Sequence, residues 1–205
     1  MILKHFVLGP LENNNYLLID DLSKDAVLVD CTEKSYEIEK ALQEYGANLK
    51  YILLTHGHFD HVLGVNYFRD KYQCKVLMHK ADQILLDTMK EFTKNFVAQK
   101  IELQYVDGYV KEGDIIKFGA NEIKVIETSG HSKGGVCYLV GDDLFTGDTI
   151  FNEAVGRTDL PGGSFTELKS NIEQKIFTLD ENIKIYPGHG PLSTVAWEKV
   201  HNKFL

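Results

Sequence analysis

The residues best suited to chemistry are clustered in the run Thr55-His56-Gly57-His58-Phe59-Asp60-His61. This run comes directly after an apolar stretch that is typical of a buried strand. In an extended segment, residues two positions apart point the same way, so His56 and His58 can approach one ion. Asp60 and His61 follow at the expected turn into a helix, close enough to serve a neighbouring position. Neutral imidazole and carboxylate are ligands that Zn²⁺ uses in catalytic sites, so the run predicts a metal site.

Several other apolar runs end in residues of the same kind. The residues that follow the predicted strand ends are Asp30, His131, Asp148 and His189. Functional loops on a rigid sheet scaffold are built in this way, because the strand ends hold the loops in place. Together with the histidine run, these positions predict one site assembled at the carboxyl ends of several strands.

The elements that must position these residues alternate along the chain. Apolar and β-branched runs bounded by Gly, Asn, Asp or Pro predict strands at Ile2–Val7, Tyr16–Ile19, Ala26–Val29, Tyr51–Leu54, Lys75–Met78, Ile115–Phe118, Ile123–Glu127, Val136–Val140, Leu144–Gly147 and Ile183–Tyr186. Helical periodicity predicts helices over Glu33–Tyr45, from a cap at Ser164 through Thr178, and over Ser193–His201. Glu167 stands at the reciprocal capping-box position for Ser164. This order predicts an α+β fold in which sheet packs on sheet and helices lie outside.

Composition restricts the class of protein. The chain has 205 residues, which fits a single domain over residues 1–205 at about 150 residues per domain. Its net charge of −8 argues against a nucleic-acid surface, which needs clustered Lys and Arg. No apolar stretch approaches the roughly 18 residues that a membrane span requires. We therefore expect a small-molecule substrate as the partner, with neither nucleic acid nor membrane, while a homo-oligomer stays open.

Cysteine usage and the start of the chain bear on the compartment. Cys31, Cys74 and Cys137 are scattered and include no Cys-x-x-Cys pair, so a disulfide framework is not expected. The start, MILKHFVLGP, has too short an apolar run for a signal peptide. Both features favour a reducing, cytoplasmic location.

The motif HGHFDH, taken with His131, Asp148 and His189, resembles the metallo-β-lactamase fold superfamily, and the resemblance runs from Asn13 nearly to the end of the chain. Three further stretches are most similar to the short glyoxalase II-like hydrolases: Thr146-Gly147-Asp148-Thr149-Ile150-Phe151, Gly156-Arg157-Thr158-Asp159-Leu160-Pro161-Gly162-Gly163-Ser164 and Pro187-Gly188-His189-Gly190-Pro191. The resemblance implies a four-layer αββα sandwich with the metals at one edge of the two sheets.

The resemblance also implies how the ligands are shared between two divalent metal ions. One ion would be held by His56, His58 and His131, and the second by Asp60, His61 and His189. Asp148 would bridge the two ions. Zinc is the expected metal, with iron or manganese as alternatives, and the two carboxylates Asp60 and Asp148 are the expected catalytic residues.

Such a pair of metals favours hydrolysis of a thioester. Two divalent metals about 3.5–4 Å apart can share a water, lower its pKa towards 7 and so supply a bridging hydroxide. A thiol of pKa about 8.5 leaves as thiolate without a strong general acid, whereas an amide needs its leaving nitrogen protonated. No residue in these motifs is an evident proton donor. The resemblance therefore implies a binuclear zinc hydrolase of small acyl thioesters, with S-lactoylglutathione as the first candidate substrate.

Three residues beside the ligands have expected supporting roles. Asp30 would fix the tautomer of a ligand through a hydrogen bond or, alternatively, cap the helix that follows Cys31. Arg157 suits recognition of a carboxylate on the substrate, although a pair with Asp159 is an equal alternative. Lys133 is a weaker candidate for contact with the substrate.

Two other functions stay open on the same scaffold. The first is a persulfide dioxygenase with a single Fe(II) held by His56, His131 and Asp148, although Leu160 and Pro161 depart from that family's pattern. The second is a protein that binds metal or a partner without catalysis. Fold alone excludes neither β-lactamase nor nuclease activity.

Overall fold

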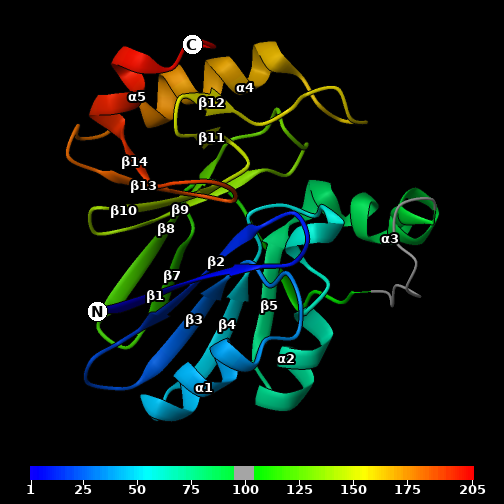
Figure 1. Ribbon diagram of the computed structural model, residues 1–205, viewed down its shortest axis with the longest axis vertical. Coiled ribbons are helices and arrows are strands. Elements are labelled where there is room, and N and C mark those ends of the chain that lie inside the picture. The colour runs from blue at the N-terminus through cyan, green and yellow to red at the C-terminus, as the bar shows by residue number, and fades with distance from the viewer. Residues whose placement is uncertain (95–103) are drawn as a thin grey trace.

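Two six-stranded sheets lie face to face in the computed structural model, which describes residues 1–94 and 104–205 (Figure 1). The first sheet has, in spatial order, β1 (Ile2–Leu8), β2 (Asn13–Ile19), β3 (Asp25–Val29), β4 (Asn48–Leu53), β5 (Lys75–His79) and β6 (Gly108–Val110). The second has β14 (Ser193–Thr194), β13 (Lys184–Pro187), β10 (Asp143–Gly147), β9 (Val136–Val140), β8 (Asn121–Glu127) and β7 (Ile115–Phe118). A small hairpin of β11 (Ile150–Phe151) and β12 (Ala154–Val155) follows β10.

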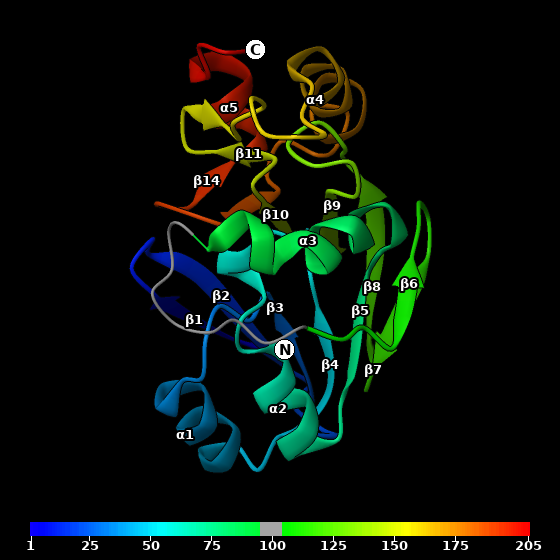
Figure 2. The same cartoon turned by 90° about the vertical axis from the view of Figure 1, so that its right-hand side faces the viewer.

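Helices lie outside this pair of sheets (Figure 2). The helices beside the first sheet are α1 (Tyr36–Glu44), α2 (Val65–Tyr72) and α3 (Gln83–Thr93), and those beside the second are α4 (Phe165–Asn171) and α5 (Val195–His201). Short 3₁₀ turns cover Phe59–His61 and Lys80–Asp82. Within residues 1–94 and 104–205, none of these helices has the length and apolarity needed to cross a membrane.

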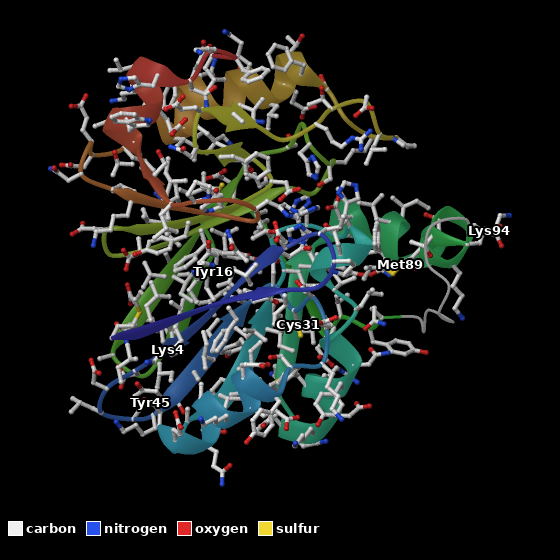
Figure 3. All side chains as sticks on the ribbon, in the orientation of Figure 1. Lys4, Tyr16, Cys31, Tyr45, Met89 and Lys94 are labelled. Carbon is white, nitrogen blue, oxygen red and sulfur yellow. The ribbon has the colours of Figure 1, made fainter. Side chains whose placement is uncertain are left out.

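Three clusters of buried apolar side chains separate the four layers. Leu17 of β2 points to the helical side and packs in one cluster with Phe68 of α2. The preceding residue, Tyr16, points the other way and packs with Phe145 of the second sheet, near the middle of the molecule in Figure 3. Leu168 of α4 belongs to the third cluster, on the outer face of the second sheet. Successive residues of a strand face opposite sides, so an apolar strand such as β2 supplies two cores at once. The expected αββα sandwich is confirmed.

Strand direction brings the ligand-bearing loops to one edge. β3 runs parallel to β4, and β10 runs parallel to β13, while β8 and β10 both pair antiparallel to β9. The carboxyl ends of β3 and β4 therefore share an edge in the first sheet, and those of β8, β10 and β13 share an edge in the second. The segments that leave these ends carry all of the residues predicted for the metal site.

The strands predicted from the sequence are all present within a residue or two at each boundary, apart from longer extensions of β2 and β4 towards their amino ends. The predicted helix at Glu33 begins instead at Tyr36, because the Ser35 side chain accepts a hydrogen bond from the backbone of Ile38 and caps it. The helix predicted from Ser193 begins at Val195, because β14 pairs with β13 and Thr194 provides the cap. A helix was expected after His61, and α2 begins at Val65, whereas α3 was not predicted.

The capping box predicted for α4 forms only in part. Ser164 accepts from the backbone N–H of Glu167, as expected, and the helix continues as a π-helix over Ile172–Ile176. The carboxylate of Glu167 does not return to Ser164. It accepts from the Ser129 hydroxyl instead, while the backbone N–H of Ser164 donates to Gly130. Glu167 therefore ties α4 to the loop that carries His131, and its predicted reciprocal role is wrong.

The three cysteines are buried as free thiols, Cys31 and Cys74 in one apolar cluster and Cys137 in another. Cys31 lies at the end of β3, labelled in Figure 3, and Cys137 lies within β9. Burial raises the pKa of the Cys137 thiol to about 11, so it stays protonated and behaves as a small apolar side chain.

Candidate metal centre

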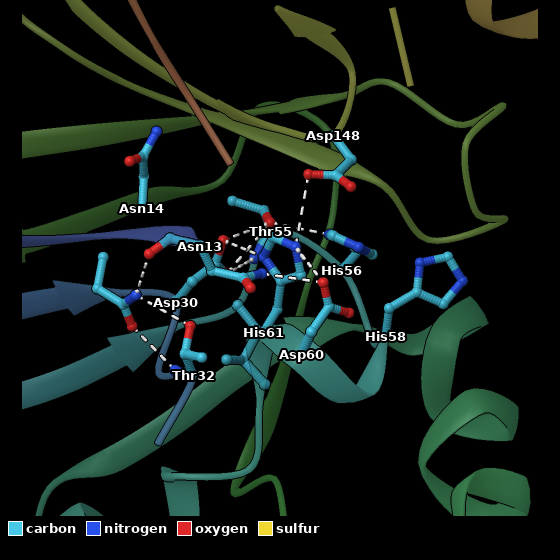
Figure 4. A network of polar contacts seen from close by, with 12 residues as sticks. Asn13, Asn14, Asp30, Thr32, Thr55, His56, His58, Asp60, His61 and Asp148 are labelled. Atoms are coloured by element: carbon cyan, nitrogen blue, oxygen red, sulfur yellow. Dashed lines mark hydrogen bonds and ion pairs between the residues drawn. The ribbon is translucent and has the colours of Figure 1, made fainter. Parts of the chain in front are cut away.

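The structure brings all seven predicted ligands together at one edge of the sandwich. Figure 4 shows five of them: His56, His58, Asp60, His61 and Asp148. His56 and His58 follow β4, and Asp60 and His61 lie in the 3₁₀ turn after them. The remaining three follow strands of the second sheet: His131 after β8, Asp148 after β10 and His189 after β13. Their ligand atoms form three overlapping groups, each spanning no more than 4.8 Å.

The first group consists of His56, His58 and His131. The Nε2 of His131 lies 2.9 Å from Nδ1 of His58 and 3.3 Å from Nε2 of His56. The other ring nitrogen of His131 donates to the backbone carbonyl of Arg157 at 2.7 Å, which leaves a lone pair on Nε2 in the neutral ring. Three imidazoles thus meet at one point, with a hydrogen-bond partner behind His131 fixing its tautomer.

The second group consists of Asp60, His61 and His189, with Asp148 between it and the first. Nε2 of His189 lies 3.5 Å from Asp60 Oδ2 and 3.6 Å from Asp148 Oδ2, and Nε2 of His61 lies 3.4 Å from Asp148 Oδ1. Asp148 Oδ2 is also 3.5 Å from His131, so this carboxylate borders both groups. This is the arrangement in which the resemblance placed two ions and a bridging carboxylate, and the partition of ligands stays a prediction.

Three buried atoms of the site have no hydrogen-bond partner among the described residues: Nε2 of His61, Oδ1 of Asp148 and Oδ1 of Asn13. The Nδ1–H of His61 donates to Asp30, and that of His189 donates to the backbone carbonyl of Leu11, so their Nε2 atoms also face inwards as acceptors in the neutral rings. Converging lone pairs and carboxylates repel one another unless a cation lies between them. The donor set therefore fits divalent metal ions with nitrogen and oxygen ligands, such as Zn²⁺ or iron.

The pKa shifts also indicate that the side of the cluster with the carboxylates favours a positive charge. Burial alone would lower the pKa of His61, but Asp60, Asp148 and Asp30 outweigh it and raise the pKa to about 10. Burial and the neighbouring ring of His131 lower the pKa of His58 to about 4. The carboxylate half of the cluster thus favours a cation, while the histidine half presents neutral rings.

Asp30 supports the cluster from behind. Its carboxylate accepts from the Thr55 backbone and hydroxyl, and it accepts from Nδ1 of His61 at 2.9 Å. The alternative role, a cap for the following helix, is wrong, because Ser35 caps that helix. Asp30 also adopts a left-handed backbone with φ 58, which turns the chain sharply at the end of β3.

Asn13 and its neighbours are site residues that sequence reasoning missed. The Asn13 amide donates to Asp60 Oδ2 at 3.0 Å and lies 3.3 Å from Nε2 of His189. Asn14 donates to the backbone carbonyls of Pro187 and Gly190, which flank His189. The available signal was a run of three asparagines at the start of a predicted strand, where polar amides are not expected to be buried.

Asp82 is a second residue that sequence reasoning missed. This fully buried carboxylate accepts from the backbone of Gly57 at 2.9 Å, from the Ser132 hydroxyl at 2.7 Å and from the backbone of Gly134 at 2.6 Å. It thereby joins the loop of His56 and His58 to the loop of His131. A Cβ at Gly57 or Gly134 would lie within 3 Å of Asp82 atoms, so both loops need glycine at the junction.

The two predicted substrate contacts lie in different places. Arg157 lines a cavity of about 300 Å³ together with Asp60, His131, Asp148 and His189. Its side chain is 62% exposed, and the guanidinium forms a bidentate pair with Asp159, with both N···O distances at 2.7 Å. The structure therefore shows the alternative expected for Arg157, the ion pair with Asp159.

Lys133 does not line the cavity of the metal ligands. It borders a separate cavity of about 340 Å³ on the far side of Leu85 and Pro161. A direct contact between Lys133 and a group bound at the metal ligands is not supported by this position.

Comparison with known proteins shows the family of this chain. The sequence matches the metallo-beta-lactamase superfamily over residues 8–189. It is 31% identical over 195 residues to the hydroxyacylglutathione hydrolase GloC of Haemophilus influenzae, an alignment that covers 93% of this chain and 92% of that protein.

Solved structures agree with this match. The fold is similar to the crystal structure of the BLEG-1 B3 metallo-beta-lactamase with a TM-score of 0.91, at 34% identity and with 100% of this chain and 99% of the other covered. It is also similar to the crystal structure of TTHA1623 in a di-iron-bound form, with a TM-score of 0.87, 29% identity, and 98% and 100% covered. On sequence and structure together, this chain belongs to the metallo-beta-lactamase superfamily, whose members bind divalent metals and include metal-dependent hydrolases.

Proposed function

We propose that this protein is a binuclear, zinc-dependent hydrolase of acyl thioesters, with S-lactoylglutathione as the first substrate to test. The observation that carries the proposal is the complete pair of ligand groups that meet at Asp148, with unpaired acceptor atoms on His61 and Asp148. A site for one ion would not need the second group of Asp60, His61 and His189.

When bound, two divalent ions would supply a water of lowered pKa and polarise the carbonyl to be attacked. The protein's own contribution is to hold the ligands rigidly. The backbone carbonyls of Arg157 and Leu11 and the carboxylate of Asp30 accept the outer N–H groups of three histidines and fix their tautomers. Asp60 keeps its charge, because His61, His189 and Asn13 lower its pKa against the effect of burial.

The cavity favours a leaving group that needs no proton. Apart from the ligands themselves, Arg157 is the only titratable side chain among the described residues that line it. A guanidinium does not give up its proton in this pH range, so it is a poor general acid. A thiol with a pKa of about 8.5 departs as thiolate, whereas an amine must be protonated. The lining thus supports a thioester over an amide as the substrate bond.

Two similar proteins support the proposed substrate and the proposed pair of metal ions. The similarity to the hydroxyacylglutathione hydrolase GloC supports a glutathione thioester as substrate. The di-iron form of TTHA1623 supports a pair of ions on this scaffold and makes iron the first alternative to zinc. The partner we propose is a small-molecule substrate, in keeping with the acidic net charge of −8.

The test combines metal content with activity in a single sample. Freshly purified protein is assayed for zinc, iron and manganese by elemental analysis, and for hydrolysis of S-lactoylglutathione. About two zinc ions per chain together with hydrolysis support the proposal. One iron per chain, oxygen uptake with glutathione persulfide and no hydrolysis would replace it with the dioxygenase alternative. Hydrolysis of a chromogenic β-lactam alone would direct the assignment to the activity named for BLEG-1.

A further inference from the structure

An apolar cleft leads away from the metal ligands between α3 and the loop that joins β12 to α4. In Figure 2, α3 faces the viewer, with that loop above it. The inner part of the cleft is a cavity of about 70 Å³, whose apolar lining comes from Phe59, Leu85, Met89, Leu160 and Pro161. Met89 is labelled on α3 in Figure 3.

The cleft borders the cavity of the metal ligands, because the two cavities share several lining residues. The inner cavity shares His58, Phe59 and Leu160 with the cavity of about 300 Å³ that holds the ligands. On its other side it shares Leu85, Thr88 and Pro161 with the outer cavity of about 340 Å³. A substituent on a carbonyl group held at the metal ligands can therefore extend past His58 along α3.

The inner cavity offers almost no hydrogen-bonding group to its contents. The hydroxyl of Thr88 donates to the backbone carbonyl of Ile84 at 2.7 Å, which leaves its methyl group for the cleft. The other lining side chains are apolar apart from His58. A polar group placed there would lose its water without a replacement partner, whereas methylene groups gain from leaving water.

Size limits the occupant to a short chain. An apolar cavity of about 150 Å³ holds the six carbons of benzene, so 70 Å³ corresponds to about three carbon atoms. A longer chain would continue into the outer cavity. The cavity of the ligands is different in character, since it contains His189, Asp60 and the guanidinium of Arg157, which suit the polar and charged thiol half of a thioester.

We propose that this cleft binds the acyl half of the substrate, and that the preferred acyl group is an unbranched aliphatic chain of about four to six carbons. This inference rests on the proposed thioester hydrolysis and narrows its substrate class. Lactoyl, with only one carbon beyond its hydroxyl-bearing carbon, would leave the cleft empty. S-lactoylglutathione should then be a slower substrate than thioesters of longer, unsubstituted acids.

The first experiment measures kcat/KM for acetyl, butanoyl and hexanoyl thioesters of glutathione. Burial of one methylene corresponds to about a fourfold gain, so butanoyl should exceed acetyl by about 15-fold, with a further gain for hexanoyl. Hydrolysis of all three thioesters with equal kcat/KM would overturn the cleft assignment and leave thioester hydrolysis standing.

A matched pair of variants locates the effect. Thr88→Phe places a ring in the cleft and should reduce the ratio of kcat/KM for hexanoyl over acetyl at least tenfold. Asp87→Phe adds the same ring at the preceding position of α3, where the side chain is exposed and lines none of the three cavities. This control variant should keep the wild-type ratio. Equal effects of the two variants on the ratio would contradict a specific cleft.

Binding without turnover separates this inference from the proposed function. Acetate, butanoate and hexanoate are titrated into the metal-loaded protein by calorimetry, because they keep the acyl chain and lack the thiol. An affinity that rises with chain length in the wild type, together with loss of this rise in Thr88→Phe, supports the cleft even if no thioester is hydrolysed. Affinity that is independent of chain length overturns the cleft, whatever the hydrolysis assays show.

Discussion

The two ends of the sandwich each contain an aspartate that is largely shielded from solvent, but the surroundings of the two carboxylates are opposite in kind. Asp20, just past the end of β2, accepts from the backbone of Leu22 and Ser23 with one oxygen and from Ala120 and Asn121 with the other. At the other end, Asp148 has an oxygen with no hydrogen-bond partner among the described residues, 3.4 Å from the Nε2 of a buried histidine.

The difference separates a structural carboxylate from one prepared for a ligand. The Asp20 oxygens are fully paired by N–H groups, so this residue ties the turn after β2 to the turn between β7 and β8 without external help. The Asp148 oxygens face the Nε2 atoms of His131 and His189, and the Nδ1–H groups of these rings donate to backbone carbonyls on the other side. A buried acceptor is costly unless something fills its place, and here that place suits a cation.

The largest effect is expected for Asp148→Ala. Loss of a hydrogen-bond partner behind a metal ligand typically costs about 10- to 100-fold, so loss of a ligand shared by two ions should lower kcat/KM by about a thousandfold or more. Metal content should fall for both ions, measured by elemental analysis. The metal-free variant should stay folded, which circular dichroism checks against metal-free wild type. Retained turnover would refute the bridging role.

Asp82→Asn tests a carboxylate that lies near the site but is fully paired. The carboxylate of Asp82 accepts from three donors, and the NH₂ group of an asparagine would face at least one of them. The buried donor then has no acceptor, which lowers the free energy of unfolding by about 2 kcal/mol. Since Asp82 joins the loops that carry His58 and His131, zinc affinity should also fall about tenfold, measured by competition with a chelator. Asp87→Asn, an exposed change on α3, is the control. Lower stability with unchanged zinc affinity would limit Asp82 to holding the fold.

The cluster of candidate ligands could be predicted from the sequence because two simple rules bring its residues together. The spacing in the run from His56 to His61 is local, and the strand before it is recognisable from its apolar residues. The more distant residues His131, Asp148 and His189 follow strand ends, and β8, β10 and β13 place those ends at one edge of the second sheet. The four-layer fold followed from the resemblance, while the pattern of elements supported only sheet on sheet with helices outside.

Of the supporting residues, Asp30 was predicted from its place after a strand end, whereas Asn13 and Asp82 could not be predicted, because their partners are distant along the chain. Asn13 contacts residues 47 and 176 positions away, and Asp82 contacts residues 25 to 52 positions away. Helix α2 follows Gly64, which provides no capping side chain, so its start carries no local signal. Asp82 precedes α3 as a capping residue would, but its carboxylate bonds to the two loops instead of the helix.

Asp20→Asn should have a smaller effect, confined to stability. Hydrogen bonds from Ser23 and Ala120 lower the pKa of Asp20 to about 2, below the ordinary value of 3.8. The ionised form therefore stabilises the fold above pH 4, and this contribution is lost as the pH falls from about 4 towards 2. The variant should have a lower Tm at pH 7 and a weaker loss of Tm over that acid range, with metal content and kcat/KM unchanged. A change in metal content would contradict the separation of the two ends.

The smallest effect is expected at Arg157, where the substrate must compete with Asp159 for an exposed guanidinium. Arg157→Ala should raise KM more than it lowers kcat, by about twofold to fivefold, because an exposed ion pair contributes about 1 kcal/mol or less. Asp159→Ala removes the competing carboxylate and should lower KM for an anionic thioester. The two variants thus move KM in opposite directions if the guanidinium binds substrate. If both raise KM, the Arg157–Asp159 pair acts by shaping the loop between β12 and α4, and the contact with the substrate is made elsewhere in the cavity.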